Sequence, residues 1–148
     1  MGQSPSSENY TSNSDDLVLV QGNADLLEGQ VIPRVWTKQI TRLAEKGDII
    51  LTVRAPVGDV GKTSYNAVIG RGVAAIRGND FIFQFLKKLQ NSGYWNSVST
   101  GSTFDSINSN ELKSTIISIP KIEEQKLIGD FFSNVDNLIT LHQRKFIM

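Results

Sequence analysis

The chain has 148 residues, of which 39% are hydrophobic and 20% charged, a composition that is typical of one globular domain and excludes an intrinsically disordered protein. Fifteen basic and fifteen acidic residues balance, so net charge identifies no partner, and the absence of cysteine excludes a disulfide framework or a cysteine zinc site. No apolar run is long enough to span a membrane and the polar N-terminus has no signal-peptide core, so we expect a soluble, cytoplasmic protein with no membrane partner.

Short apolar runs between turn residues predict β-strands along most of the chain. Taken in chain order, the predicted strands cover residues 17–20, 31–36, 49–53, 67–69, 73–76 and 115–119. The stretch 37–46, with Ile40 and Leu43 on one face, predicts a short helix between the second and third of these strands.

Two further helices are predicted from capping residues. Asn79 or Asp80 can cap a helix that ends at Gly93 and whose apolar face is Ile82, Phe85, Leu86 and Leu89. Asn108, followed three residues later by Glu111, has the capping-box pattern of a second helix start.

After Pro120 the pattern changes to that of one long helix, beginning at about Glu123. Apolar or aromatic residues and one histidine recur at alternating spacings of four and three, which is a heptad seam. The seam consists of Ile128, Phe132, Val135, Ile139, His142 and Phe146. About three heptads are too few for a stable isolated helix, so this helix needs the domain, another chain or both. The seam is too apolar to stay exposed, and we expect it to pack against a second copy or a partner subunit.

Strands and helices do not alternate regularly enough for a doubly wound parallel sheet. The sequence therefore predicts an α+β fold, with a curved mixed or antiparallel sheet, short helices and the long C-terminal helix. We expect a division at residue 120, between a domain over 1–120 and a helix over 121–148.

The distribution of charge is more informative than its sum. Residues 1–29 contain five acids and no base, whereas residues 30–80 contain eight bases and four acids, a net charge of +4. A neutral chain with this asymmetry can present a basic face to nucleic acid, although bases scattered over a solvated surface would give the same count.

No catalytic or metal-binding constellation stands out. Gly70–Ala75 matches the G-x-G-x-x-A dinucleotide fingerprint, but only four apolar residues follow the second glycine, which predicts a strand rather than the required helix. His142 is the one histidine and lies on the helix seam. No histidine lies close in sequence to Ser99, Ser102 or Ser106, and none of these serines lies in a G-x-S-x-G motif. We therefore expect a protein that is not an enzyme, with no metal and no cofactor of its own.

The stretch Ser99–Leu112 combines small polar residues with apolar anchors. Its hydroxyls, amides and glycine suit phosphate oxygens and base edges, while Phe104 and Ile107 can hold the loop against the core. An ordinary polar loop over a buried phenylalanine is the alternative.

Taken together, several stretches carry a family resemblance that covers essentially the whole chain. They are the N-terminal MGQSPSSENY, the runs GDIILTVRAPVGDVGK and GRGVAAIRG, the STGST loop, and IPKIEEQKLI leading into a helix that ends HQRK. In this order they resemble one target recognition domain and the following helix of a type I restriction-modification specificity subunit.

The resemblance implies partners and a role. Such a subunit has two recognition domains, each reading one half of a split double-stranded DNA site, and has no catalysis of its own. It binds an S-adenosylmethionine-dependent adenine methyltransferase subunit and a restriction subunit, so the cofactor is expected on the methyltransferase alone. This chain has one recognition domain, and we expect it to be a half-subunit or a fragment.

With that resemblance, the polar loop and the bases in or beside loops become candidates for contact with DNA. Arginines can read guanine, Gln21 and Gln39 can read adenine, and the other side chains can bind phosphates. The predicted DNA-binding residues are Arg34, Lys38, Gln39, Arg54, Lys62, Arg71, Ser99, Thr100, Ser102 and Thr103. Two alternatives stay open: a protein-docking module that acts through its C-terminal helix without stable DNA binding, and, more remotely, a nucleotide-dependent enzyme.

Overall fold

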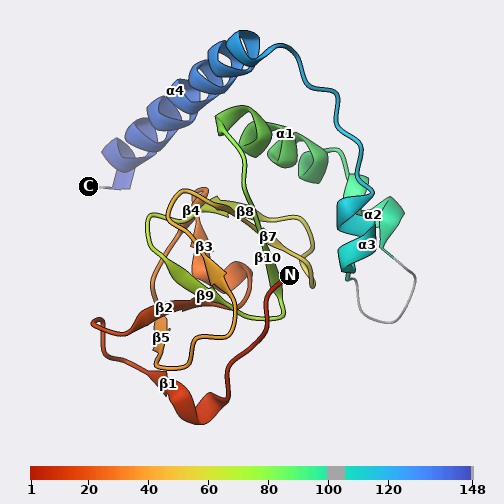
Figure 1. Ribbon diagram of the computed structural model, residues 1–148. Helices are drawn as coiled ribbons and strands as arrows, with labels where there is room; N and C mark the ends of the chain where they lie inside the picture. Colours follow the sequence, from red (N-terminus) through yellow and green to blue (C-terminus); the bar gives the residue numbers. More distant parts are fainter. Residues whose placement is uncertain (100–105, 148) are drawn as a thin grey trace.

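Figure 1 shows the computed structural model, which describes the chain over residues 1–99 and 106–147 and the side chains up to Lys145. The strands form two five-stranded sheets. The first contains, in spatial order, β1 (Tyr10–Thr11), β5 (Val35–Thr37), β2 (Leu17–Val20), β9 (Ala67–Ile69) and β6 (Leu43–Ala44). The second contains β10 (Val73–Ile76), β7 (Ile49–Thr52), β8 (Val60–Lys62), β4 (Gln30–Val31) and β3 (Leu26–Leu27).

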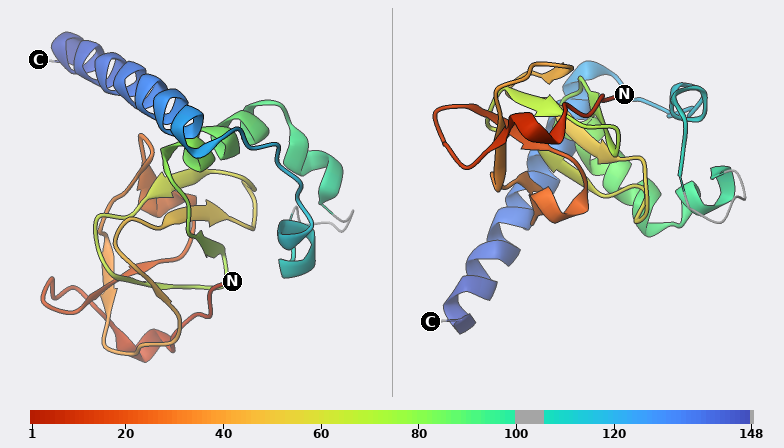
Figure 2. Two further views of the ribbon diagram at one scale, coloured as in Figure 1. Left: turned by 45° about the horizontal axis from the view of Figure 1, so that its top comes forward. Right: turned by 90° about the horizontal axis from the view of Figure 1, so that it is seen from below.

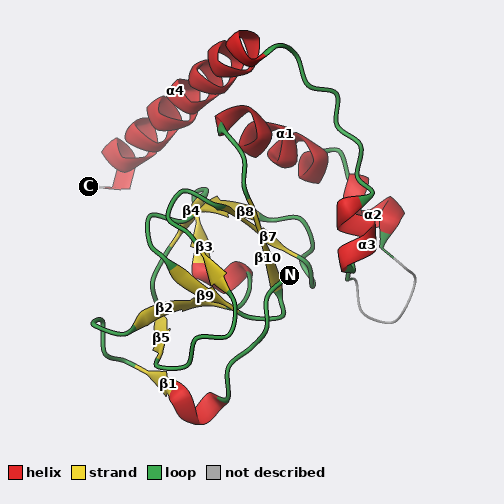
Figure 3. Cartoon of the chain, viewed as in Figure 1, coloured by secondary structure: helices red, strands yellow, loops and turns green. Residues whose placement is uncertain are grey.

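Both sheets are mixed. β2 pairs with β9 in parallel, as β4 does with β8, and the other strand pairs are antiparallel. Two short 3-10 turns, η1 (Ser7–Asn9) and η2 (Asn23–Asp25), interrupt the N-terminal half. The helices are α1 (Asp80–Asn91), α2 (Tyr94–Val98), α3 (Ser109–Lys113) and α4 (Ile122–Ile147), and Figure 3 shows that α1 to α4 gather on one side of the strands.

The strand β7 explains how one domain supports two apolar cores. Successive strand residues point to opposite faces of a sheet, and every residue of β7 is buried. Ile49 and Leu51 pack with α1 and Trp95 in one core, whereas Ile50 packs between the two sheets in the other. The nearly continuous apolar run that predicts this strand is typical of a strand that is buried on both faces.

The helix α1 connects the sheets to α4. Its N-cap Asn79 accepts a hydrogen bond from the backbone N–H of Ile82, as the sequence predicts. Phe83 and Leu86 enter the core that contains Ile49 and Leu51 of β7. In Figure 2, α4 lies across α1 and its C-terminal end projects beyond the strands.

The predicted α+β class with a long C-terminal helix is confirmed, but three predicted elements are wrong. The predicted strand over residues 31–36 is divided, because β4 and β5 pair in different sheets and residues 32–34 between them are not part of a strand. Residues 37–46 contain the strand β6 instead of a helix, because Leu43 and Ala44 pair with β9. Residues 115–119 are extended without a strand partner, and Ile116 is 91% exposed. Among the described helices, none is long and apolar enough to cross a membrane.

Candidate nucleic-acid interface

A cleft of about 660 Å³ opens between the N-terminal segment, the end of β2, η2 and the turn from β9 to β10. Three arginines from separate parts of the chain line it, namely Arg34, Arg54 and Arg71, and all three are predicted DNA-binding residues. Among the described residues that line the cleft, Asp25 is the single acid. We call this site the arginine cleft.

Arg71 is displayed by a turn that packs tightly against the N-terminal segment. Its backbone N–H donates a 3.1 Å hydrogen bond to the hydroxyl of Ser4. The backbone N–H of Gly2 donates to the carbonyl of Val73 at 3.0 Å. On the other side, a Cβ at Gly72 would lie 2.2 Å from the carbonyl oxygen of Gln21, so the turn and the end of β2 approach as closely as backbones can. The Arg71 side chain, by contrast, is exposed at the cleft.

Arg34 is held by the turn η2. Its Nη1 donates a 3.1 Å hydrogen bond to the carbonyl of Ala24 and lies 3.8 Å from Oδ1 of Asp25. The Asp25 carboxylate is buried, and its Oδ2 accepts a 2.8 Å hydrogen bond from the backbone N–H of Gln21. The guanidinium of Arg34 is therefore tethered, although its side chain stays 54% exposed.

Arg54 lies where the loop that follows α2 rejoins the core. It forms an isolated antiparallel bridge with Ser106, and the N–H of Ile107 donates to the carbonyl of Val53 at 2.9 Å. Ile107 is buried, as the sequence predicts for an anchor of this loop, and the capping box of Asn108 and Glu111 is present. The C-terminal end of the predicted contact loop is thus fixed beside the arginine cleft.

The hydroxyl residues of that loop divide in two. Ser99 ends α2, where its N–H donates to the carbonyl of Trp95 at 3.0 Å. Thr100, Ser102 and Thr103, predicted to contact DNA, and the predicted anchor Phe104 lie outside the described residues.

Lys62 is not brought to the arginine cleft. It lines a different cavity, between the β3–β4 turn, α1 and α4, where its ammonium pairs with the carboxylate of Asp80. Desolvation by burial lowers the pKa of Lys62. The sequence predicts Lys62 near Arg54 because both flank the segment 55–61. In the structure Lys62 belongs to β8 and pairs with Ile49, so it lies at the end of the β7–β8 hairpin that is farthest from the turn.

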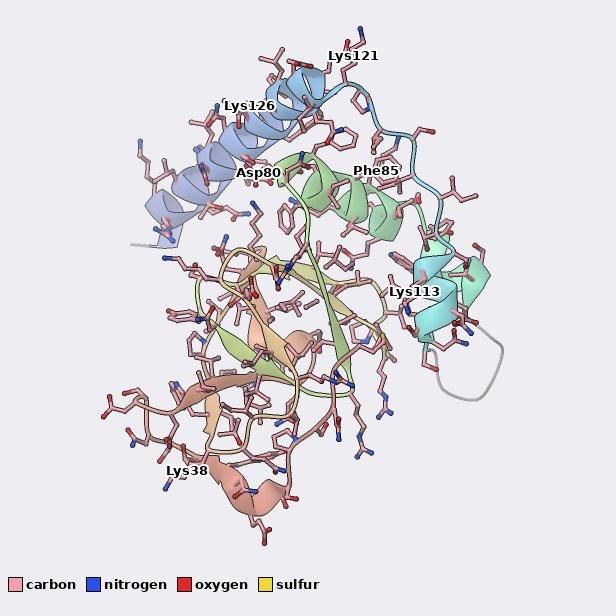
Figure 4. All side chains as sticks on the ribbon, in the orientation of Figure 1. Lys38, Asp80, Phe85, Lys113, Lys121 and Lys126 are labelled. Carbon is pink, nitrogen blue, oxygen red and sulfur yellow. The ribbon has the colours of Figure 1, made fainter. Side chains whose placement is uncertain are left out.

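Lys38 and Gln39 lie at the end of β5. The side-chain carbonyl of Gln39 accepts hydrogen bonds from the backbone N–H of Ser6 at 2.8 Å and from the side chain of Asn9 at 3.0 Å. Gln39 therefore fixes the N-terminal segment, and Lys38 is exposed at the far end of the molecule from α4 (Figure 4).

Two residues of the cleft escape sequence reasoning. Ser4 contacts Arg71 across 67 positions of the chain, which no local pattern predicts. Asp25 belongs to the acidic N-terminal stretch, whose charge argues against contact with DNA. A signal for Asp25 exists in the short spacing from Gln21 to Asp25, which is typical of a side chain that closes its own turn.

The helix α4 docks on α1 through small and polar groups. Gly129 lies against the start of α1, and the amide of Gln125 accepts a 2.9 Å hydrogen bond from Asn79. Asp136 accepts hydrogen bonds of 2.9 Å from both Gln84 and Lys87. Burial acts to raise the pKa of Asp136, but these hydrogen bonds and the charge of Lys87 outweigh it and hold the pKa below its usual value.

The predicted heptad seam lies beside this contact and is only partly covered by it. Ile128, Phe132 and Ile139 are 37%, 46% and 50% exposed, and Val135 is half-buried. The predicted seam residue Phe146 lies beyond the described side chains. We call the exposed side of α4 its apolar face, which consists of Ile128, Phe131, Phe132, Val135, Leu138 and Ile139.

Comparison with known proteins gives a consistent assignment. The model of the type I restriction modification DNA specificity domain matches residues 6–147. Over 98% of its length, the chain is 31% identical to the MjaX type I restriction enzyme specificity subunit of Methanocaldococcus jannaschii, and it covers 35% of that subunit. The MjaIX specificity subunit of the same organism is 33% identical over 66% of this chain and 24% of its own length.

Solved structures agree. A chain from a type I R-M system, solved to explain complex assembly and conformational transition, aligns with a TM-score of 0.84 and 29% identity over 98% of this chain and 37% of that one. The HsdS subunit from Thermoanaerobacter tengcongensis aligns with a TM-score of 0.78 and 28% identity, over 98% of this chain and 36% of that one. The S subunit from M. genitalium shares the fold. It aligns with a TM-score of 0.67 and 19% identity, over 92% of this chain and 35% of that one. The chain thus spans about a third of the length of these relatives.

Proposed function

The chain belongs to the type I restriction-modification DNA specificity family, and on that basis we propose that it reads one half of a bipartite double-stranded DNA site through the arginine cleft. The specificity component of such a system is non-catalytic, and its domains in general recognise DNA. The single observation that carries the proposal is the gathering of Arg34, Arg54 and Arg71 at one cleft.

The chemistry of the cleft suits DNA. Arginine presents a planar fork of N–H donors that matches phosphate oxygens and the guanine edge, so a cleft with three of them favours both affinity and base recognition. The loop that ends beside Arg54 adds Ser99, Thr100, Ser102 and Thr103 as further proposed contacts. Lys38, Gln39 and Lys62 lie outside the cleft, and we assign them at most a peripheral part.

The wider assembly follows as part of the same proposal. We assign DNA reading to residues 1–120, and binding of the adenine methyltransferase and restriction subunits to the helix over 121–148 and the surface beside it. S-adenosylmethionine would then belong to the methyltransferase, and this chain would direct its activity to the site.

The test is the salt dependence of binding to a duplex of mixed sequence. Each phosphate contact contributes about 0.9 to the slope of log K against log salt, so the double variant Arg54→Gln, Arg71→Gln should lower the magnitude of the slope by about 2. The matched control is Lys121→Gln, Lys126→Gln, which removes the same charge at the start of α4 (Figure 4). An equal loss of slope in both doubles would contradict the proposal, because binding would then follow net charge alone.

A second function is favoured by the apolar face of α4. Exposed phenylalanines and isoleucines on one side of a helix are typical of a docking surface. We propose that this face packs against the same face of a second copy, or against the equivalent helix of a partner subunit, which would place two recognition domains in one assembly.

Self-association provides the check. Phe131→Asp should shift sedimentation at high protein concentration from dimer towards monomer, because a charge on the apolar face must be desolvated on pairing. Asn137→Asp, which adds the same charge to an exposed position on the polar side of α4, should leave the dimer intact. A wild-type chain that stays monomeric at every concentration would restrict this surface to partner subunits.

A further inference from the structure

The three arginines of the cleft are not equivalent. Arg34 is tied to Ala24 and Asp25. The side chains of Arg54 and Arg71 form no hydrogen bond or ion pair with any other described residue. One arginine is thus oriented by the protein before DNA arrives, and the other two are free to follow a phosphate backbone.

We infer that Asp25 is a positioning residue that holds Arg34 for recognition of a guanine edge, whereas Arg54 and Arg71 contact phosphates. The inference deepens the proposed function and rests on it. It assigns a role to an acid inside a cleft that is otherwise lined by basic and uncharged residues.

The geometry shows why Asp25 can act as a fixed support. The residue is 7% exposed, and its two oxygens are used separately: Oδ2 by the backbone N–H of Gln21 at 2.8 Å, and Oδ1 towards Arg34 at 3.8 Å. Its own carbonyl accepts the N–H of Ile32 at 2.8 Å. The segment that leads to Arg34 is therefore hydrogen-bonded to Asp25, and the tip of the Arg34 side chain lies within ion-pair distance of the same residue.

The consequence for the ligand follows from charge and orientation. Guanine is recognised by two parallel N–H donors that must be aligned with its O6 and N7, so fixing the guanidinium favours base reading. Arg34 has five N–H donors, and the Nη1 contacts leave those on Nη2 and Nε for DNA. A neighbouring carboxylate also repels phosphate, which opposes indiscriminate backbone binding at this point.

The experiment is selection of bound duplexes from a library of random sequence by the full chain, followed by sequencing, with affinity for one scrambled duplex measured in parallel. Wild type should enrich guanine at one position. Arg34→Gln should abolish that preference. Asp25→Asn should weaken it about fivefold or more, because Asn keeps the acceptor for Gln21 but loses the charge that orients Arg34. Affinity of Asp25→Asn for the scrambled duplex should stay equal or rise.

Two further variants separate positioning from folding. In the double variant Asp25→Asn, Arg34→Gln, the base preferences should equal those of Arg34→Gln alone, since Asp25 acts through Arg34. Arg34→Lys keeps the charge but lacks the planar fork of donors, so it should also lose the guanine preference. This variant replaces Asp25→Asn in the test if Asp25→Asn is too unstable to assay.

The chain offers a closely matched control. Asp48 has a side chain that is 12% exposed, accepts a 2.8 Å hydrogen bond from the backbone N–H of Glu45 and lies 3.9 Å from Arg77, away from the cleft. Asp48→Asn removes the same charge and should leave the selected sequences unchanged.

The outcomes distinguish the role of Asp25 from the proposed function of the cleft. If wild type selects a sequence and either Asp25→Asn or Arg34→Lys keeps the guanine preference, the role of Asp25 is overturned while the proposed function stands. A uniform loss of affinity for all duplexes in Asp25→Asn would also overturn it, in favour of a structural role. If wild type selects no sequence, the proposed function and this inference fail together.

Discussion

Alanine at position 129 is expected to destabilise the protein, although alanine is the best helix former. The added Cβ would lie 2.8 Å from the backbone nitrogen of Phe81, 2.9 Å from the Cβ of Asp80 and 3.1 Å from its carbonyl carbon. Backbone cannot move aside cheaply, so overpacking of this kind costs about 1–3 kcal/mol or more. The gain in helix propensity is only about 1 kcal/mol. We expect a net loss of about 1–2 kcal/mol in the free energy of unfolding, measured by urea denaturation.

The matching control lies on the same helix. Asn134 is exposed, and Asn134→Ala should stabilise the protein by about 0.5 kcal/mol through propensity alone. The sign of the change in stability therefore separates a helix α4 that packs on α1 at Gly129 from one that does not. Two variants that both stabilise would mean that α4 does not pack on α1 at Gly129, and that the helix is free to leave the domain.

Elements with a strong local signal are those that the sequence predicts well. The run Ile49–Val53 contains β7 because all of its side chains are buried and its four apolar side chains enter the two apolar cores. Asn79 and Asn108 cap helices because a capping side chain needs only the next three residues. These features depend on a few consecutive residues, which a sequence displays completely.

Tertiary pairing decides two of the wrongly predicted elements, the helix over residues 37–46 and the strand over residues 115–119. Leu43 pairs with Val68 across 25 positions, and this pairing overrides the helical spacing of Ile40 and Leu43. The residues 115–119 have high β propensity, but no described strand lies beside them, and Ile116 and Ile119 are 91% and 59% exposed. Propensity cannot show whether an edge is within reach.

Only part of the candidate cleft could be predicted from the sequence. Its arginines could be proposed because they flank turns, and turns reach the surface. Their convergence depends on sheet order, which brings the β9–β10 turn beside the end of β2 through parallel pairing of β2 and β9. Lys62 flanks a turn as Arg54 does, yet Asp80 engages its ammonium at another cavity. Asp25 shows the reverse case, an acid that the local charge pattern argues against and the fold places inside the cleft.

The turn that begins at Arg54 depends on the close packing of Gly58 against Trp95. The substitution Gly58→Ala, which disrupts this packing, is expected to have the largest effect on stability. Gly58 has a φ of 97°, which L-residues rarely adopt, and its N–H closes the turn on the carbonyl of Thr52 at 2.9 Å. A Cβ there would lie 2.3 Å from Cδ1 of Trp95, whose side chain is 2% exposed in the core. Gly58→Ala combines backbone strain of about 1–3 kcal/mol with overpacking of about 1–3 kcal/mol.

Gly47→Ala isolates the packing part of this effect. Gly47 has nearly the same φ, 95°, but nothing lies within 4 Å of the position of its Cβ, so alanine there meets the strain alone. Urea denaturation should therefore show a loss for Gly58→Ala that exceeds the loss for Gly47→Ala by about 1–3 kcal/mol. Trp95 also supports the helix α2, which leads into the predicted contact loop. Gly58→Ala should therefore weaken the proposed DNA binding at temperatures where the variant remains folded. Gly47→Ala should leave this binding unchanged. Equal losses of stability in the two variants would mean that Trp95 yields to the new methyl group, and the rigidity of the turn that carries Arg54 would then have to come from elsewhere.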